Sequence, residues 1–344
     1  MNLSKTIRSF FATVIVGIEV DNKSCIIASK FYKNGKNIDT QTKEFKTIPG
    51  ELPAQAVRYV KKIRTKNPFT YISTLSSSII QGAIHNEKEV EFEKYGINPN
   101  EIVQKNQNSW LVYVSKDGIA ETKKRFLKLG ADFIISPFMV LYYLSKNIFQ
   151  DSCKLYILFQ RSNITMIVTN KNEGVLFGGY YVLDSEIDSE LKVVENTYNF
   201  DDEDDLSSGI QDELSDVDGI DFSHDGSDEE LIEVLKGDDS DFDSSDESSG
   251  EDNSGDDLND YARVTTASKF IQTALNEFYN NELYKSEFIN DIVVFNPHNI
   301  EEETLKQIEN ITMLEVRIEE CNISEVLANL GYESYKYFDE KGQV

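Results

Sequence analysis

The side chains that could hold a metal or act as nucleophiles are few in this chain of 344 residues. Its three cysteines and three histidines lie far apart in the sequence, so no CxxC knuckle, disulfide framework or zinc-site spacing is present. The G-x-S-x-G, HExxH and Walker motifs are also absent. We therefore predict no catalytic residue, no metal site and a reducing compartment. The three cysteines are Cys25, Cys153 and Cys321, and the three histidines are His85, His224 and His298.

One stretch has a composition typical of calcium loops. Residues 221–226 (DFSHDG) resemble the opening of an EF-hand loop, and residues 216–219 (DVDG) resemble a calcium turn. An EF-hand loop requires a bidentate Glu at its twelfth position, and the twelfth residue counted from Asp221 is Ile232. We interpret the stretch as a solvated acidic linker that binds divalent cations weakly.

This linker belongs to an acidic segment, residues 184–260. The segment holds 31 Asp and Glu against two Lys, whereas the whole chain has 61 acidic and 34 basic residues. The rest of the chain therefore carries 32 basic and 30 acidic residues and is nearly neutral. A segment so charged and so poor in apolar residues buries too little surface to offset its ordering entropy. We predict a disordered acidic insertion over residues 184–261.

The beginning of the chain has some features of a signal peptide. Lys5 and Arg8 precede an apolar run at residues 10–18, but Glu19 and Asp21 follow at once and no cleavage site is apparent. The run is also shorter than the ~20 residues that a membrane helix needs. We predict a buried first strand and a cytoplasmic protein.

The folded part repeats one order of elements. Near-continuous apolar or alternating runs predict strands, and apolar residues at helical spacing predict helices. Each half reads β-β-β-α-β-α with extra elements, which predicts an α/β fold of two similar halves: residues 1–150, and residues 151–183 with 262–344. The predicted strands are 13–19, 24–32, 38–45, 69–75, 110–114, 131–135, 155–159, 164–169, 174–183, 292–295 and 313–318. The predicted helices are 52–63, 118–129, 137–148, 267–281, 300–308 and 323–330, the last one ended by Gly331.

Three antiparallel strands followed by helix-crossover strands, occurring twice, resemble the actin-like (ribonuclease H-like) fold. Within that fold, the chain resembles the PilM-like proteins of type IV pilus assembly and the cytoplasmic domain of the secretion protein GspL. The matching stretches are residues 17–24 (GIEVDNKS), the strand–helix–Gly–strand–Pro pattern over 112–138, and the hairpin pair over 155–177. In the actin-like fold, ATP binds between the halves, with its phosphates on a turn after the first strand of each half.

The nucleotide motifs that this resemblance implies are altered here. Glu19, Asp21 and Asn22 lie at the first phosphate turn, where the family has Asp and Gly, so a carboxylate and a Cβ take the place of open backbone. The second turn, residues 158–163 (LFQRSN), has neither acid nor glycine, and the adenosine loop near 296–299 (NPHN) has no glycine. We predict that ATP and Mg²⁺ binding are lost.

The resemblance implies a non-catalytic scaffold of a bacterial type IV pilus, type II secretion or DNA-uptake assembly platform. Such a scaffold binds a short cytoplasmic segment of a single-span inner-membrane protein and links it to a motor ATPase. It is cytoplasmic, peripheral to the inner membrane, and does not bind nucleic acid. Its oligomeric state stays open, a dimer included. The resemblance places the docking groove in the first half, and we predict it around residues 79–114.

Two other functions stay open from the sequence. The first is an actin-like ATPase that uses Glu19 and Asp21 around Mg²⁺, which would bind ATP despite the altered turns. The second is an acidic regulator or weak cation-binding tether, whose function would reside in residues 184–260 alone.

Overall fold

The computed structural model describes residues 11–47, 51–85, 92–183 and 254–341, with only the backbone for 254–259. Most of the acidic insertion predicted over residues 184–261 therefore lies outside the described residues. Its last part is helical, because helix α6 begins at Ser254.

The first sheet has five strands in the order β3-β2-β1-β4-β8. Strands β1, β2 and β3 pair antiparallel, while β1, β4 and β8 run parallel. Asn34 and Gly35 have positive φ angles of 51° and 79°, as the hairpin predicted at this Asn-Gly pair requires. The bounds are β1 (Thr13–Val20), β2 (Ser24–Lys33), β3 (Lys36–Lys46), β4 (Phe69–Leu75) and β8 (Phe133–Ile135).

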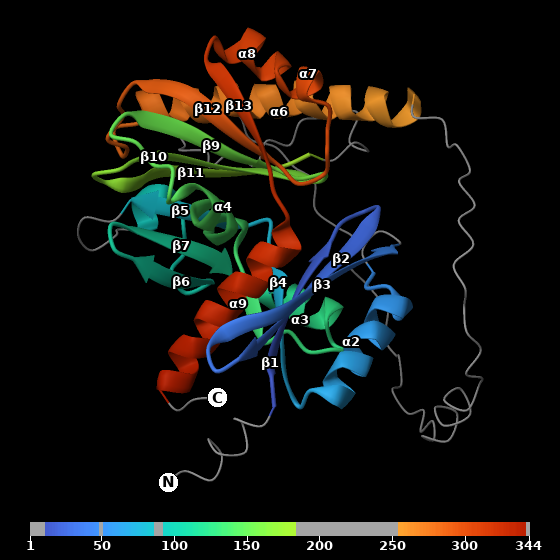
Figure 1. Ribbon diagram of the computed structural model, residues 1–344. Coiled ribbons are helices and arrows are strands. Elements are labelled where there is room, and N and C mark those ends of the chain that lie inside the picture. Colours follow the sequence, from blue (N-terminus) through green and yellow to red (C-terminus); the bar gives the residue numbers. More distant parts are fainter. Residues whose placement is uncertain (1–10, 48–50, 86–91, 184–253, 342–344) are drawn as a thin grey trace, which may run out of the picture. The chain divides into compact units, whose positions relative to one another are not determined.

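Helices cover both faces of this sheet (Figure 1). Apolar residues of α2 (Ala54–Lys66) pack on one face, together with Phe126 and Leu129, which follow α3 (Lys116–Arg125). The last helix, α9 (Ile323–Glu340), packs on the other face. Burial on both faces explains why β1 is apolar along nearly its whole length.

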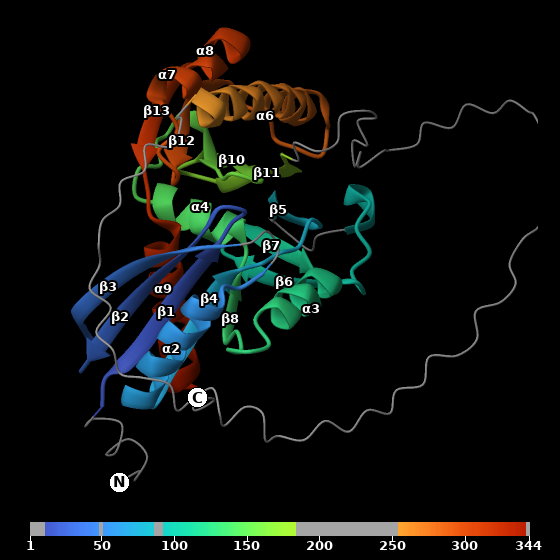
Figure 2. The same cartoon turned by 90° about the vertical axis from the view of Figure 1, so that its right-hand side faces the viewer.

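The second sheet has eight strands in the order β13-β12-β9-β10-β11-β5-β7-β6. Helices α6, α7 and α8 pack on one face of it, and α4 lies against the other (Figure 2). The strands are β5 (Gln81–His85), β6 (Ile102–Gln107), β7 (Trp110–Ser115), β9 (Cys153–Phe159), β10 (Asn163–Asn170), β11 (Gly174–Val182), β12 (Ile289–Asn296) and β13 (Glu315–Glu320). The helices are α4 (Pro137–Ser145), α6 (Ser254–Asn280), α7 (Glu302–Leu305) and α8 (Gln307–Thr312), and a short 3₁₀ helix spans Phe92–Tyr95.

The two sheets share one topology. In the second sheet, β13-β12-β9-β10-β11 repeats the order β8-β4-β1-β2-β3 of the first. The predicted duplication of two α/β halves is therefore confirmed. Strands β5, β7 and β6 come from the first half but extend the second sheet through β11, where Ile84 pairs with Phe177.

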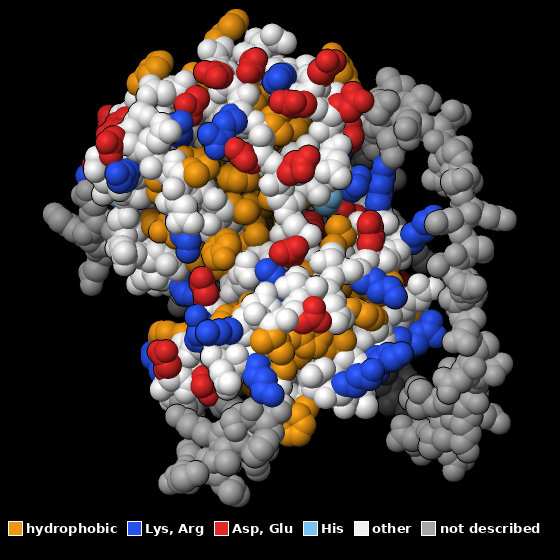
Figure 3. Space-filling model, viewed as in Figure 1, with side chains coloured by type: hydrophobic (Ala, Val, Ile, Leu, Met, Phe, Trp, Pro, Cys, Tyr) orange, Lys and Arg blue, Asp and Glu red, His pale blue; other side chains and the backbone are white. Residues whose placement is uncertain are grey.

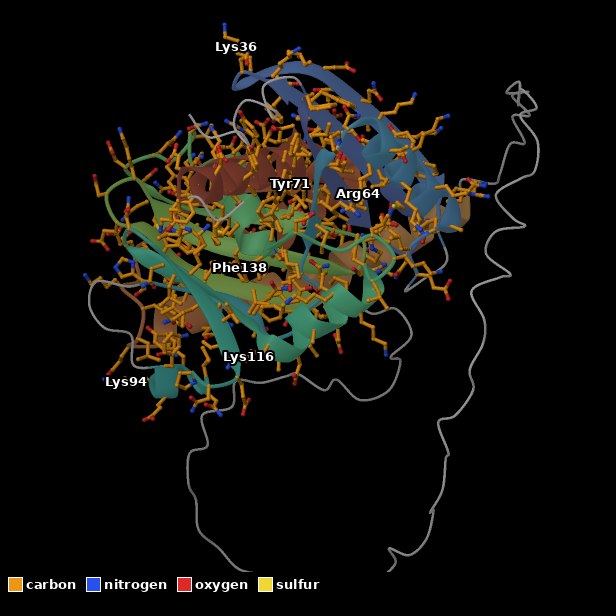
Figure 4. The ribbon with its side chains drawn as sticks, turned by 90° about the horizontal axis from the view of Figure 1, so that it is seen from below. Lys36, Arg64, Tyr71, Lys94, Lys116 and Phe138 are labelled. Atoms are coloured by element: carbon orange, nitrogen blue, oxygen red, sulfur yellow. The ribbon has the colours of Figure 1, made fainter. Side chains whose placement is uncertain are left out.

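The end of each half crosses to the sheet of the other. Helix α4, with its buried Phe138, packs against β9 and β10 of the second sheet, whereas α9 packs on β1 of the first. Figure 4 shows Phe138 among the side chains of the interior and Lys36 at the outer tip of the β2–β3 hairpin. A Cβ on Gly17 would lie 1.9 Å from the Ser324 carbonyl oxygen, so only glycine permits this approach of α9.

Some predicted boundaries are wrong. Gly331 does not end a helix at 330, because α9 continues to Glu340 and Gly331 instead contacts Ile15 and Ser73 of the first sheet. The stretch between residues 76 and 109 contains strands β5 and β6, which sequence patterns missed because β6 is mostly polar. The helix predicted over 300–308 is two short helices, α7 and α8.

Candidate functional site

Three turns converge where the strands β1, β9 and β12 end. Asp21 follows β1, Arg161 follows β9 and His298 follows β12. The Nε of Arg161 donates to Oδ2 of Asp21 at 3.1 Å, and the two side chains are 24% and 8% exposed. The site predicted from Glu19, Asp21 and Asn22 therefore lies at the junction of the two halves. Asn22 itself is exposed.

The first of these turns is closed by its own residues. Oδ1 of Asp21 accepts hydrogen bonds from the backbone N–H groups of Lys23 and Ser24, at 2.6 and 2.7 Å. The N–H of Asp21 donates to the carbonyl of Ser24 at 2.9 Å. In a phosphate-binding turn such amides would point to the ligand. Here three of them are satisfied within the turn, two by the Asp21 carboxylate and one by the Ser24 carbonyl. The residues do not suit a bound triphosphate.

A buried histidine lies between the two carboxyl groups of β1 and its turn. Nε2 of His298 lies 3.6 Å from Oε1 of Glu19, and Nδ1 lies 3.6 Å from Oδ2 of Asp21. Burial, reinforced by the charge of Asp21, raises the pKa of Glu19 to about 8. Burial lowers the pKa of His298 to about 4. Near neutral pH, Glu19 is therefore a protonated acid and His298 a neutral imidazole.

The second turn is held by an arginine from helix α6. Arg263 donates from Nη2 to the carbonyl of Gln160 at 3.0 Å and from Nε to the carbonyl of Arg161 at 2.9 Å. Its Nη1 pairs with Asp260, and its guanidinium lies over the Phe159 ring. The N–H of Gln160 is also used, because it donates to the carbonyl of Asn163 at 2.9 Å. This turn is therefore fixed by its own chain, as the first one is.

A cavity of about 220 Å³ lies beside this cluster, smaller than the ~300–1,000 Å³ typical of ligand pockets. Its lining joins the end of β1, the loop after β4, the end of α3, the β9–β10 turn and the end of β11. The lining residues are Val20, Asp21, Thr74, Leu75, Ser76, Ser77, Ile79, Arg125, Phe126, Pro137, Gln160, Arg161, Ser162, Asn163, Tyr180 and Val182.

The sequence placed the three turns but not the side chains that pair across them. Arg161 and His298 lie in the stretches 158–163 and 296–299, which lack the expected glycines. The sequence shows His298 only as one of three scattered histidines, and no sequence pattern marks Arg263 as a residue of the site. Among the described residues, no three His, Cys, Asp or Glu side chains form a group that could hold a metal ion. No helix in the described part of the chain is long and apolar enough to cross a membrane.

Solved structures share this fold. The chain is similar to the "PilM-PilN type IV pilus biogenesis complex", with 12% identity, a TM-score of 0.50, and coverage of 91% of this chain and 89% of that one. It is also similar to a Bacteroides thetaiotaomicron protein of actin-like ATPase fold and unknown function, with 9% identity, a TM-score of 0.45, and coverage of 96% and 99%. No curated protein matches the chain.

At this identity, the likeness to the PilM-PilN complex shows the fold alone. Together with the repeated strand order, it confirms the predicted fold class, a duplicated actin-like α/β fold. Two family models also match, one in each half. The model described as "Domain of unknown function (DUF8569)" matches residues 10–142, and the model described as "Domain of unknown function (DUF8341)" matches residues 155–336. Because the second match spans more than half of the 344 residues, the chain belongs to the DUF8341 family.

Proposed function

We propose that this protein is a non-catalytic docking scaffold that has kept the actin-like fold and lost its nucleotide. The observation that carries this proposal is the Asp21 turn. The Asp21 carboxylate accepts hydrogen bonds from the backbone N–H groups of Lys23 and Ser24 and pairs with Arg161 from the other half. ATP would have to break these contacts and then lie beside a buried carboxylate, which repels its phosphates.

The charge of the acidic segment supports the same proposal. Its described ends lie at the candidate site, because the N–H of Leu183 donates to the carbonyl of Ser162 at 2.7 Å and Asp260 pairs with Arg263. The chain therefore enters the acidic segment beside the second turn, and this segment carries 31 acidic and two basic residues. Such a charge lowers the local concentration of a polyanion such as ATP.

The partner is proposed from the likeness to the PilM-PilN complex. We propose that the chain binds a short segment of a single-span inner-membrane protein of a pilus, secretion or DNA-uptake machine, and links it to a motor ATPase. The protein would then be cytoplasmic and peripheral to the membrane. The region predicted for docking, residues 79–114, contains Ile79, Ile80 and Val103, which are 68%, 55% and 50% exposed. Exposed apolar side chains of this kind support a protein contact.

A thermal melt of the full chain with and without millimolar Mg-ATP tests the loss of nucleotide. A ligand at about 100 times its dissociation constant adds roughly 2.7 kcal/mol, or several degrees in Tm. We expect no shift. An upward shift that the Arg161→Ala variant abolishes would instead support an actin-like ATP-binding protein.

Docking is tested with synthetic cytoplasmic segments of candidate single-span proteins, by fluorescence anisotropy. The Ile80→Glu and Val103→Glu variants should weaken binding of the segment, because each puts a charge on the proposed surface. Met313→Glu is the matched control, since Met313 is 85% exposed and lies outside the region. If Met313→Glu weakened binding as strongly as the other two variants, residues 79–114 would not be the docking region.

A further inference from the structure

The cavity beside the candidate site contains polar atoms that nothing in the described part of the chain satisfies. Nε of Arg125, Oε1 of Gln160 and Oδ1 of Asn163 are buried and have no hydrogen-bond partner there. All three residues line the cavity. A buried polar atom without a partner costs about 1–3 kcal/mol, so three around one cavity require hydrogen-bonding partners inside it, which are waters in the empty cavity and polar groups of a ligand in the occupied one.

The charge of the cavity is set by Arg125. The other guanidinium groups nearby are neutralised, Arg161 by Asp21 and Arg263 by Asp260. Arg125 forms no ion pair with a described carboxylate; burial lowers its pKa, and the more distant charge of Asp21 offsets this in part. The cavity therefore suits a ligand with a single negative charge.

The two amide oxygens narrow the chemistry further. Oε1 of Gln160 and Oδ1 of Asn163 accept hydrogen bonds, so the ligand must also donate. A phosphate ion presents mainly acceptor oxygens and would leave these two atoms facing like charge. A peptide that ends in a carboxylate has both features, because its anionic group lies next to a backbone N–H.

The rest of the lining is mixed, because it contains the hydroxyl side chains of Thr74, Ser76, Ser77 and Ser162 beside a set of apolar residues. Two apolar residues of the lining, Ile79 and Val182, also form an exposed rim, because their side chains are 68% and 41% exposed. The cavity volume of about 220 Å³ corresponds to roughly seven waters. One residue that carries a terminal carboxylate, an N–H and an apolar side chain uses that volume well. A side-chain carboxylate beside an apolar residue would need two residues. The apolar wall is made by Val20, Leu75, Ile79, Phe126, Pro137, Tyr180 and Val182.

We propose that this cavity binds the apolar C-terminal residue of a partner peptide. The terminal carboxylate pairs with Arg125, the backbone N–H donates to Gln160 or Asn163, and the side chain lies between Ile79 and Val182. This inference rests on the proposed docking function and assigns that function a second contact, which shares only Ile79 with the docking region.

The probe is N-acetyl-glycyl-leucine, compared with its C-terminal carboxamide in ligand-observed NMR on the full chain. We expect saturable binding of the acid and at least about tenfold weaker binding of the amide, as loss of a charged hydrogen bond implies. Arg125→Gln should cause a similar loss, and Arg58→Gln, on the exposed face of α2, should cause none. Equal binding of acid and amide, or full binding to Arg125→Gln, would overturn the proposal.

Two further measurements keep the proposal testable if Arg125→Gln does not fold. Ile79→Glu changes an exposed rim residue and should leave the fold intact. The new carboxylate should weaken binding of the dipeptide acid by charge repulsion. Inorganic phosphate and N-acetyl-glutamate methylamide are tested as competitors. Competition by phosphate that depends on Arg125 would make the cavity a phosphate site, and stronger binding of the glutamate probe would assign a side-chain carboxylate. Either result would overturn the terminal-carboxylate proposal.

The cavity and the docking function fail in different ways. Arg125→Gln could abolish binding of the dipeptide acid while Ile80→Glu leaves binding of the partner segment unchanged. In that case the proposal of docking at residues 79–114 is wrong and the cavity proposal holds. If the partner segment binds and the dipeptide acid does not, the cavity proposal fails alone.

Discussion

The two halves meet in two contacts of opposite character. In one, the backbone of α9 lies directly on β1, where Gly17 leaves no room even for a Cβ. In the other, the turns after β1 and β9 meet through the Asp21–Arg161 pair, with His298 beside them. The first contact is a close approach of two backbones. The second is made by polar side chains that are partly buried.

This difference separates a contact that holds the fold from one that lies at the candidate site. Close packing makes the contact of α9 with β1 intolerant of added atoms. The polar turns are different, because a buried ion pair is weak support for stability and is retained for other reasons.

The largest loss of stability should come from Gly17→Ala. The new Cβ would lie 1.9 Å from the Ser324 carbonyl oxygen and 2.6 Å from the Ala328 nitrogen, and these backbone atoms of α9 cannot rotate away. We expect a loss of about 3 kcal/mol in the free energy of unfolding, measured with urea.

Gly96→Ala is the control for Gly17→Ala. Gly96 has a φ of 64° with no atom within 4 Å of a Cβ, so alanine meets backbone strain of about 1 kcal/mol without a clash. An equal loss in the two variants would contradict the close contact of α9 and β1.

The second effect tests the polar contact. Arg161→Met removes the charge that neutralises Asp21 and leaves a carboxylate that is 8% exposed. We expect a loss of about 2 kcal/mol, below that of a fully buried pair because Arg161 is 24% exposed. Asp21→Asn combined with Arg161→Met should recover part of this loss. Strict additivity in the double-mutant cycle would mean that the two side chains do not interact.

A third effect uses pH. The folded pKa of Glu19 is about 8, against 4.5 for the free group, so the folded protein keeps a proton that the unfolded chain releases. Its contribution to stability therefore falls as pH rises from about 4.5 to 8. Glu19→Gln cannot titrate and should be more stable than the wild type at pH 8.5, by up to about 5 kcal/mol, and similar at pH 4. A constant difference between the two proteins across this range would contradict a protonated Glu19.

Much of the fold could be predicted from the sequence, because its signals are local. The apolar strands, the Asn34-Gly35 hairpin and the Pro137 helix start depend on neighbouring residues, and the structure has all three. The failures come from tertiary contacts. Gly331 has the appearance of a helix stop, yet it lies inside α9 because its missing side chain lets the helix approach Ile15.

The candidate site is less predictable for the same reason. The missing glycines of three turns could be seen in the sequence, but not the pairing of Asp21 with Arg161, which are 140 residues apart. Nothing in the neighbourhood of Arg263 indicates that it holds the carbonyls of Gln160 and Arg161. The sequence shows which residues are charged, but it does not show which of them pair, because the pairing is set when the two halves pack together.

The smallest expected effect measures what an unpaired surface charge contributes. Figure 3 shows Lys and Arg side chains gathered over α2, whose last turn contains Arg64 and Lys66. We interpret them as complementing the helix dipole, so Lys66→Ala should cost about 0.5 kcal/mol at low salt and almost nothing at 0.5 M salt. Lys61→Ala, further from the helix end, should cost less.

The Asp21–Arg161 coupling should persist at high salt, because that pair is shielded from solvent ions. If salt removed both effects alike, the polar contact between the halves would be no more than a surface pair.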